Sequence, residues 1–188
     1  MIKIPLWEKI PFKKPKLEDE IHANLASVPI FEGLRKRHLK TIQTLCHVRQ
    51  YRKDEMVFHH GDPGAVMFIL LEGEVLVYND EGSVVREFAR LYPGDFLGDL
   101  ALLVDLPRTA SAKAINFTRT ACFARSEFLD FVKRNPHAGN TLLLNMSRLI
   151  GGRLVYSNNE LEKAVSRNYI LEKENDLLKS KKRKKNNG

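Results

Sequence analysis

The chain contains few cysteines and has no apolar run long enough to cross a bilayer. Only Cys46 and Cys122 are present among its 188 residues, and no secretory signal is recognised at the start. A reduced, cytoplasmic setting without a disulfide framework is therefore expected, with both thiols acting as buried apolar groups. The longest apolar run, residues 65–71, is far shorter than the roughly 20 residues of a membrane-spanning helix. The sequence thus predicts no transmembrane segment.

The central part of the chain also lacks an excess of basic residues, although the formal net charge is +8. Residues 1–16 hold five Lys and one Glu, and residues 179–188 hold six Lys or Arg and no acid. The segment between them, residues 17–178, holds 20 basic and 22 acidic residues. The positive charge therefore belongs to the two ends, and the central part carries no signal for nucleic-acid binding.

The hydrophobic pattern divides the chain into four segments. Residues 1–16 contain three prolines, which exclude a continuous helix and favour an extended arm. Residues 17–135 are expected to form one domain, because this length suits a single well-packed core. Residues 136–178 are expected to form a long helix used for dimerisation, and residues 179–188 a basic tail.

Within the predicted domain the apolar spacing changes from helical to strand-like and back again. Residues 17–46 have helical spacing, which predicts two short helices, and a further helix is expected after Ser126, which we interpret as its cap. Short runs between turn residues predict an antiparallel β-roll of the jelly-roll type, in an α+β fold that is mainly β. The expected strands are residues 47–51, 56–58, 66–71, 75–78, 84–88, 109–115 and 120–124, with a turn at 79–82.

The long helix carries a heptad pattern. Position a is occupied by Leu154, Leu161, Asn168 and Asn175, and position d by Ile150, Ser157, Ala164, Leu171 and Leu178. Asparagine at position a favours parallel two-stranded coiled coils, so we expect a parallel homodimer. The alternative is a single amphipathic helix that packs on its own domain.

Residues 93–112 interrupt the strand pattern with what reads as one or two helical turns. Gly98 permits a close approach of a ligand to the backbone, and Asp99 could start a helix at Leu100. The first N–H groups of a helix have no partners within it and suit an anion. Arg108 follows a proline and supplies a planar guanidinium that can donate to two phosphate oxygens.

Residues 96–103 and 107–111, which read Phe-Leu-Gly-Asp-Leu-Ala-Leu-Leu and Pro-Arg-Thr-Ala-Ser, closely resemble the phosphate-binding cassette of cyclic-nucleotide-binding domains. Residues 61–75 and 31–34 resemble other parts of the same family. The resemblance covers about residues 17–133 and is followed by a helix of the family's kind. It implies a sensor of cAMP or cGMP that acts in signal transduction. Because the sequence ends soon after the long helix, we expect no helix-turn-helix domain for sequence-specific DNA binding.

The resemblance also implies a set of binding residues. Arg108 and nearby amides would hold the cyclic phosphate, and Asp99 would meet the ribose 2′-hydroxyl. Asp99 departs from the usual glutamate by one methylene, a gap that a water could bridge. Thr109 and two polar residues of the long helix would lie near the base without deciding between adenine and guanine. The implied residues are Gly98, Asp99, Leu100, Ala101, Arg108, Thr109, Ala110, Ser157 and Asn158.

Three alternatives stay open. In the first, Asp99 is only a helix cap, Arg108 pairs with Asp99 or Asp105, and the domain is a dimeric scaffold for protein partners that has lost its ligand. In the second, the basic ends bind DNA without sequence preference. In the third, His59 and His60 belong to a metal site, which their opposite directions on a strand disfavour. No catalytic triad or phosphate loop of the Gly-Lys-Ser/Thr kind is present, so enzyme activity is not expected.

Overall fold

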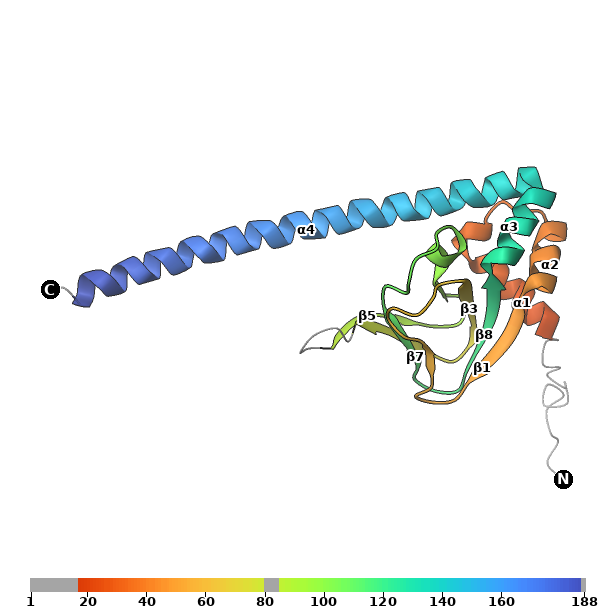
Figure 1. Ribbon diagram of the computed structural model, residues 1–188, viewed down its shortest axis with the longest axis horizontal. Helices are drawn as coiled ribbons and strands as arrows, with labels where there is room; N and C mark the ends of the chain where they lie inside the picture. Colours follow the sequence, from red (N-terminus) through yellow and green to blue (C-terminus); the bar gives the residue numbers. More distant parts are fainter. Residues whose placement is uncertain (1–16, 80–84, 187–188) are drawn as a thin grey trace, which may run out of the picture. The chain divides into compact units, whose positions relative to one another are not determined.

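The computed structural model describes residues 17–79 and 85–186, and the chain divides into two compact units, residues 1–145 and 146–188. The first unit contains two antiparallel four-stranded sheets, with strand orders β1-β8-β3-β6 and β2-β7-β4-β5 (Figure 1). The predicted α+β fold with a β-roll is therefore confirmed. The strands are β1 (His47–Tyr51), β2 (Met56–Phe58), β3 (Val66–Glu72), β4 (Val75–Asn79), β5 (Arg86–Leu91), β6 (Phe96–Leu97), β7 (Ser111–Ala114) and β8 (Thr118–Ala124).

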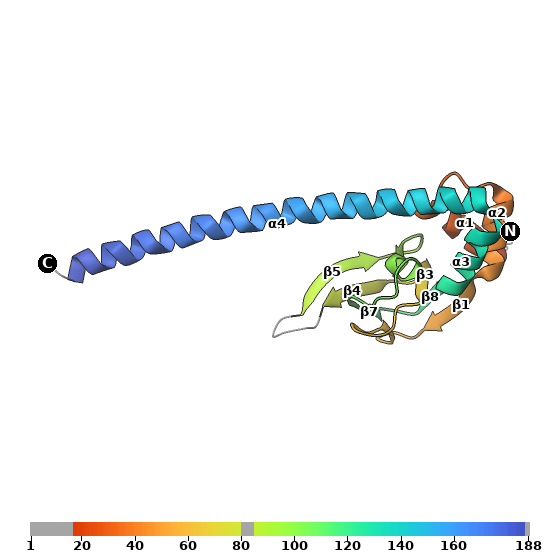
Figure 2. The same cartoon turned by 45° about the horizontal axis from the view of Figure 1, so that its top comes forward.

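The helices flank the roll in the order that the sequence predicts. The first unit contains α1 (Leu17–Ser27), the 3₁₀ helix η2 (Pro29–Phe31), α2 (Lys36–Leu45), a second 3₁₀ helix η3 (Asp99–Leu102) and α3 (Arg125–Arg134). Figures 1 and 2 show α1, α2 and α3 grouped at the same end of the roll, close to β1 and β8. The long helix α4 (Pro136–Asn186) starts directly after Asn135, because proline is well suited to the first position of a helix.

Strands β3 and β8 have one face in the roll and the other face toward the helices. Phe68 and Leu70 of β3 belong to the core cluster inside the roll, together with the fully buried Tyr51. On the other side, the ring of Phe123 lies 6.4 Å from that of Phe31 and 6.2 Å from that of Phe128. Alternate residues of a strand point to opposite faces, so these two strands are covered on both sides.

Cys46 lies between α2 and β1, and Cys122 lies in β8. Cys46 is the C-terminal cap residue of α2, and Cys122 packs against the core cluster. Both thiols are free and half-buried. Burial raises the pKa of Cys46 to about 12 and also raises the pKa of Cys122, so neither has the low pKa of a reactive cysteine.

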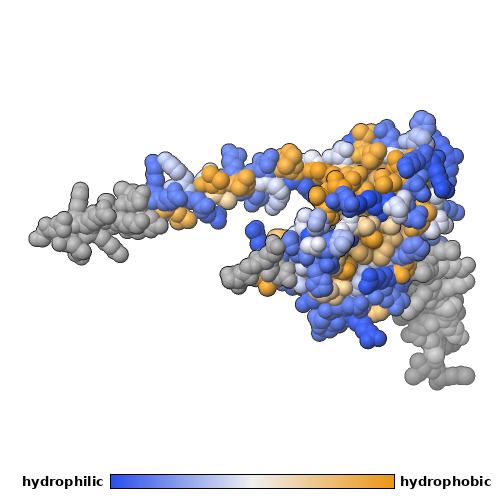
Figure 3. All heavy atoms as spheres, viewed as in Figure 1, coloured by the Kyte–Doolittle hydropathy of each residue, from blue (hydrophilic) through white to orange (hydrophobic). Residues whose placement is uncertain are grey.

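Helix α4 has a fully exposed middle part. It continues through Gly151 and Gly152, and every residue from 151 to 173 is exposed. Figure 3 shows hydrophobic residues at intervals along this helix between hydrophilic ones. Within the described residues no helix is apolar enough over a sufficient length to span a membrane.

Several local predictions need correction. The short strand β6 was not predicted, and β5 lies later in the chain than expected. Helix α3 begins at Arg125, and its cap residue is Ala124 without a side-chain hydrogen bond, so the interpretation of Ser126 as the cap is wrong. The backbone of α4 extends to Asn186, through most of the segment named as a basic tail. The N-terminal arm and the turn at 80–82 lie outside the described residues.

Candidate functional site

The segment that resembles a phosphate-binding cassette begins with a sharp turn at Gly98. Strand β6 pairs with β3 through Leu97 and Phe68, and Gly98 then adopts a left-handed conformation with φ of 75°. Helix η3 follows at once, with Gly98 as its cap residue and without a side-chain cap. The expected start at Leu100 with Asp99 as the cap is therefore wrong by one residue, because the left-handed turn falls at Gly98 and Asp99 is already the first residue of η3.

The backbone around Arg108 is fixed by the turn between β2 and β3. The amide of Arg108 donates to the carbonyl of Asp62 at 2.8 Å, and the amide of Gly61 donates to the carbonyl of Arg108 at 2.9 Å. Pro63 and Pro107 form an isolated antiparallel bridge next to these bonds. The turn that the sequence analysis assigned to the resemblance therefore holds the arginine in place.

The side chain of Arg108 points inward and is buried, with an exposed fraction of 8%. Its Nη2 donates to the carbonyl of Val66 at 2.8 Å, and its guanidinium lies 4.3 Å from the ring centre of Phe58 and 5.5 Å from that of Phe68. Gly98 lies against the same guanidinium, since a Cβ placed on Gly98 would collide with Nη1 of Arg108. The arginine and the start of η3 thus face each other.

The hydrogen-bonding capacity of Arg108 is only partly used. A guanidinium has five N–H donors, and the buried Nε of Arg108 has no hydrogen-bond partner among the described residues. Burial lowers the pKa of Arg108, while the charge of Asp62 acts in the opposite direction. A buried cation with an unused donor is costly unless an anion compensates it. This is the strongest electrostatic sign of a ligand site in the described part of the chain.

The other implied residues lie around this pair with different exposures. Asp99 is buried, with an exposed fraction of 5%, as are Ala101 and Ala110, whereas Leu100 and Thr109 are exposed. The amide of Ala101 donates to the carbonyl of Gly98 at 3.1 Å, so in the structure this donor is used within η3. Ser157 and Asn158 belong to α4 in the second unit, and both are exposed.

Arg125, the first residue of α3, is a further residue at this site that the sequence did not predict. Its Nε donates to the carbonyl of Ala101 at 2.5 Å, and its Nη2 donates to the carbonyls of Val104, at 2.7 Å, and of Gly64. Its Nη1 lies 2.8 Å from the carboxylate of Asp105. Asp105 therefore pairs with Arg125, and not with Arg108 as one alternative supposed. A basic residue after a strand gives no signal by itself, because three of its partners are backbone carbonyls distant in sequence.

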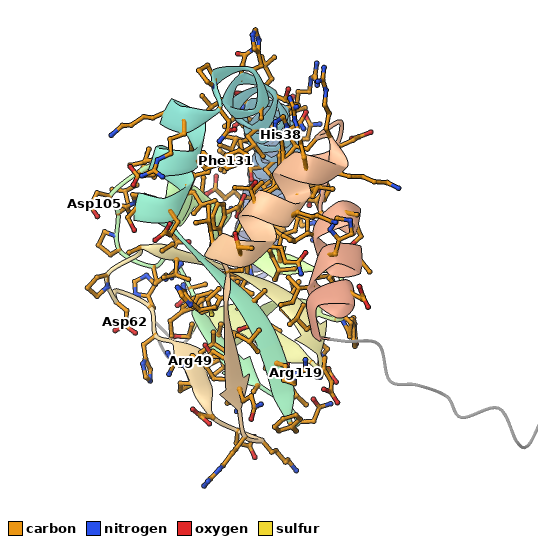
Figure 4. The ribbon with its side chains drawn as sticks, turned by 90° about the vertical axis from the view of Figure 1, so that its right-hand side faces the viewer. His38, Arg49, Asp62, Asp105, Arg119 and Phe131 are labelled. Atoms are coloured by element: carbon orange, nitrogen blue, oxygen red, sulfur yellow. The ribbon has the colours of Figure 1, made fainter. Side chains whose placement is uncertain are left out.

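Asp62, in the turn before β3, contacts His59. The carboxylate of Asp62 accepts one hydrogen bond from the amide of His59 at 2.8 Å and lies 3.5 Å from Nδ1 of the same residue. Across the described residues, no group of three or more His, Cys, Asp or Glu side chains is placed to hold a metal ion. Figure 4 shows Asp62 and Asp105 along one edge of the molecule, away from Arg119.

Comparisons with known proteins agree with the resemblance found in the sequence. Residues 48–135 match the family described as Cyclic nucleotide-binding domain. The chain is 27% identical over 135 residues to the Cyclic AMP receptor protein of Thermus thermophilus, which covers 71% of this chain and 61% of that protein. It is 29% identical over 120 residues to the cAMP-dependent protein kinase regulatory subunit of Dictyostelium discoideum, which covers 62% of this chain and 36% of that protein.

Solved structures agree on the fold. The crystal structure of Thermus thermophilus Catabolite Activator Protein matches with a TM-score of 0.65 at 27% identity, over 72% of this chain and 62% of that one. A cyclic nucleotide-binding domain from Methylobacillus flagellatus matches with a TM-score of 0.66 at 22% identity, which supports the fold alone. The chain thus spans less than two thirds of the length of the two curated relatives and of the Thermus thermophilus structure.

Proposed function

We propose that the domain binds a 3′,5′-cyclic purine nucleotide and acts as a regulatory sensor in signal transduction, not as an enzyme. The observation that supports this most directly is the buried guanidinium of Arg108 beside the backbone of Gly98. The cyclic phosphate is a compact anion that would satisfy the unused donor of Arg108. Two relatives whose names refer to cyclic AMP make cAMP the first ligand to test.

In this proposal, different residues contact the phosphate, the ribose and the base of the ligand. Arg108 would hold the phosphate together with the amides of Leu100 and Ala110. The amide of Ala101 would join them only if its bond to the carbonyl of Gly98 opened. Buried Asp99 would accept a hydrogen bond from the ribose 2′-hydroxyl, directly or through water. Three exposed polar residues would lie near the base. They are Thr109 from the cassette and Ser157 and Asn158 from α4.

Ligand binding would regulate the protein through α4. A ligand shifts a conformational equilibrium only when it makes contacts in one state that are absent in the other. In our proposal the bound nucleotide neutralises Arg108 and draws α4 over the base, which changes the dimer geometry or exposes the ends of the chain to a cytoplasmic protein partner.

Calorimetric titration of the full chain with cAMP and with cGMP tests the proposed ligand. At least one nucleotide should bind with a stoichiometry of one per chain. Thermal unfolding gives an independent readout, because a ligand at 100 times its Kd stabilises a protein by about 2.7 kcal/mol. If neither nucleotide at millimolar concentration gives heat or thermal stabilisation, the proposed sensor function is wrong. The alternative, a dimeric scaffold for protein partners, would then remain.

We also propose that α4 forms a parallel homodimer. Leu154, Leu161 and Leu171 lie on the predicted seam and are exposed by 59%, 63% and 50% respectively. Apolar side chains at heptad spacing on an exposed helix are typical of a coiled-coil interface. Asn168 at a central position a would select the parallel, two-stranded arrangement.

Sedimentation equilibrium at micromolar concentration tests the dimer. The chain should sediment with twice its mass of 21.6 kDa, and Leu161→Glu should give the monomer, because two glutamates would face each other in the seam. Val155→Glu is the matched control, since Val155 is as exposed as Leu161, 61% against 63%, but lies at heptad position b. A monomeric parent chain, or equal effects of the two substitutions, would contradict the predicted seam.

A further inference from the structure

Arg125 joins three segments of the first unit through one side chain. Its guanidinium contacts the carbonyl of Gly64 in the turn before β3 and the carbonyl of Ala101 in η3. It also contacts the carbonyl of Val104 and the carboxylate of Asp105, in the loop that leads to Arg108. The side chain is 19% exposed. Because Arg125 is the first residue of α3, the contacts connect the cassette directly to a helix.

The backbone of Arg125 continues this connection toward Arg108. The amide of Arg125 donates to the carbonyl of Ala65 at 2.8 Å, and the next carbonyl, that of Val66, accepts the bond from Nη2 of Arg108. The segment Gly64–Val66 therefore lies between the two arginines and is bonded to both. A shift of the cassette relative to β3 would disturb the bonds of Arg125 and the position of Arg108 together.

The hydrogen bonds from Arg125 to backbone carbonyls should stabilise the position of the cassette more than the ion pair with Asp105 does. The carboxylate of Asp105 is 92% exposed, and ion pairs with such exposed partners contribute little because water screens them. Ala101 lies in the last turn of η3, where a helix leaves its carbonyls without internal partners, and Val104 follows two residues after the end of η3. Hydrogen bonds from a charged donor to these groups are stronger than those between neutral groups.

We propose that Arg125 is a positioning residue, which holds the cassette in register with Arg108 and couples occupation of the phosphate site to helix α3. The positioning part concerns the chain alone, and the coupling part rests on the proposed function. Nε, Nη1 and Nη2 of Arg125 are all engaged by groups of the turn before β3, of η3 and of the loop before Arg108. It therefore acts on a ligand through the placement of η3 and the loop before Arg108.

Hydrogen exchange of the full chain without nucleotide tests the positioning role. Arg125→Ala should speed exchange of the amides of residues 99–106 at least ten-fold, and the strands β3 and β8 should speed only by the loss of overall stability. Arg125→Lys keeps the charge but has a single donor group instead of the fork, so its effect should be intermediate. Asp105→Ala should change exchange only slightly, because it removes the exposed ion pair and keeps the carbonyl bonds.

Arg119 supplies a matched control. It is 21% exposed, and its Nη1 lies 3.1 Å from Glu72 on the neighbouring strand, but its position is remote from the cassette (Figure 4). Arg119→Ala should leave exchange of residues 99–106 unchanged. The positioning role is overturned if Arg125→Ala leaves these amides as slow as in the parent chain. It is overturned equally if Asp105→Ala reproduces the whole effect, since the ion pair would then be the determinant.

Exchange with saturating nucleotide tests the coupling. In the parent chain the ligand should slow exchange in the first turns of α3, residues 126–130, and in Arg125→Ala this slowing should be lost although the site is filled. Coupling between two sites is reciprocal, so Arg125→Ala should also weaken nucleotide binding, about ten-fold. Equal slowing in both chains overturns the coupling. If the parent chain binds neither nucleotide, the proposed function fails, while the measurement without nucleotide still decides the positioning role.

Discussion

Arg108→Ala is expected to weaken cyclic-nucleotide binding by at least about 100-fold. The guanidinium would donate two charge-assisted hydrogen bonds to the phosphate, each worth about 1.5 to 3 kcal/mol, and a factor of ten corresponds to about 1.4 kcal/mol. Calorimetric titration of the variant with cAMP and cGMP measures the loss. Arg108→Lys should recover part of the affinity, because it restores the charge without the planar fork.

This substitution should affect binding far more than folding. Arg108 is buried, and burial lowers its pKa, so its removal relieves a desolvation cost that offsets the lost contacts with Phe58 and Phe68. Thermal unfolding without ligand should therefore change little. Arg119→Ala, which removes an arginine that is remote from the cassette, should bind like the parent chain. An Arg108→Ala chain that folds and keeps full affinity would exclude Arg108 as the phosphate-binding group.

Gly98→Ala is expected to abolish nucleotide binding and to destabilise the domain. Gly98 has φ of 75°, and an added Cβ would collide with Nη1 of Arg108 and approach the carbonyl of Val66 to 3.0 Å. The left-handed conformation costs roughly 1 to 2 kcal/mol for a residue with a Cβ. The collision additionally displaces the arginine from the start of η3. Thermal unfolding and calorimetric titration measure the two effects separately.

Gly33→Ala is the matched control for the cost of the left-handed conformation. Gly33 has φ of 77°, and an added Cβ there would lie 3.8 Å from Cγ2 of Thr141, an ordinary contact. This variant should lose a similar amount of stability and retain binding. If Gly33→Ala and Gly98→Ala weaken binding equally, the close approach of Gly98 and Arg108 has no role in recognition and the proposed phosphate site is wrong.

Much of the β-roll could be predicted because its strands are short apolar runs between turn residues. β1 and β2 have the predicted bounds, and β3, β4, β7 and β8 lie within two residues of them. Two elements could not be found in this way. β6 has only two residues, and it is a strand because Phe96 and Leu97 pair with β3, which is a tertiary effect. Helix α3 starts at Arg125, one residue before Ser126, and the amide of Arg125 bonds to the carbonyl of Ala65, which is distant in sequence.

The candidate site was predictable to a similar extent. Gly98 and Arg108 stand out in the sequence because a turn glycine and an arginine after proline interrupt a strand pattern, and the structure brings them together. The contacts of Arg108 with Phe58, Phe68 and Val66 come from strands far earlier in the chain and leave no local pattern. The position of Asp99 inside η3, and not at its cap, follows from the left-handed turn at Gly98.

The double coverage of β8 makes this strand an internal standard for stability. β8 pairs with β1 on one side and β3 on the other, and both of its faces are covered. Its backbone bonds can open only when the sheet, the roll interior and the helical layer separate together, so its amides should exchange through global unfolding alone. The exchange rates of Ala121 and Phe123 therefore report the free energy of unfolding of the whole domain, against which local opening of the cassette can be measured in the same sample.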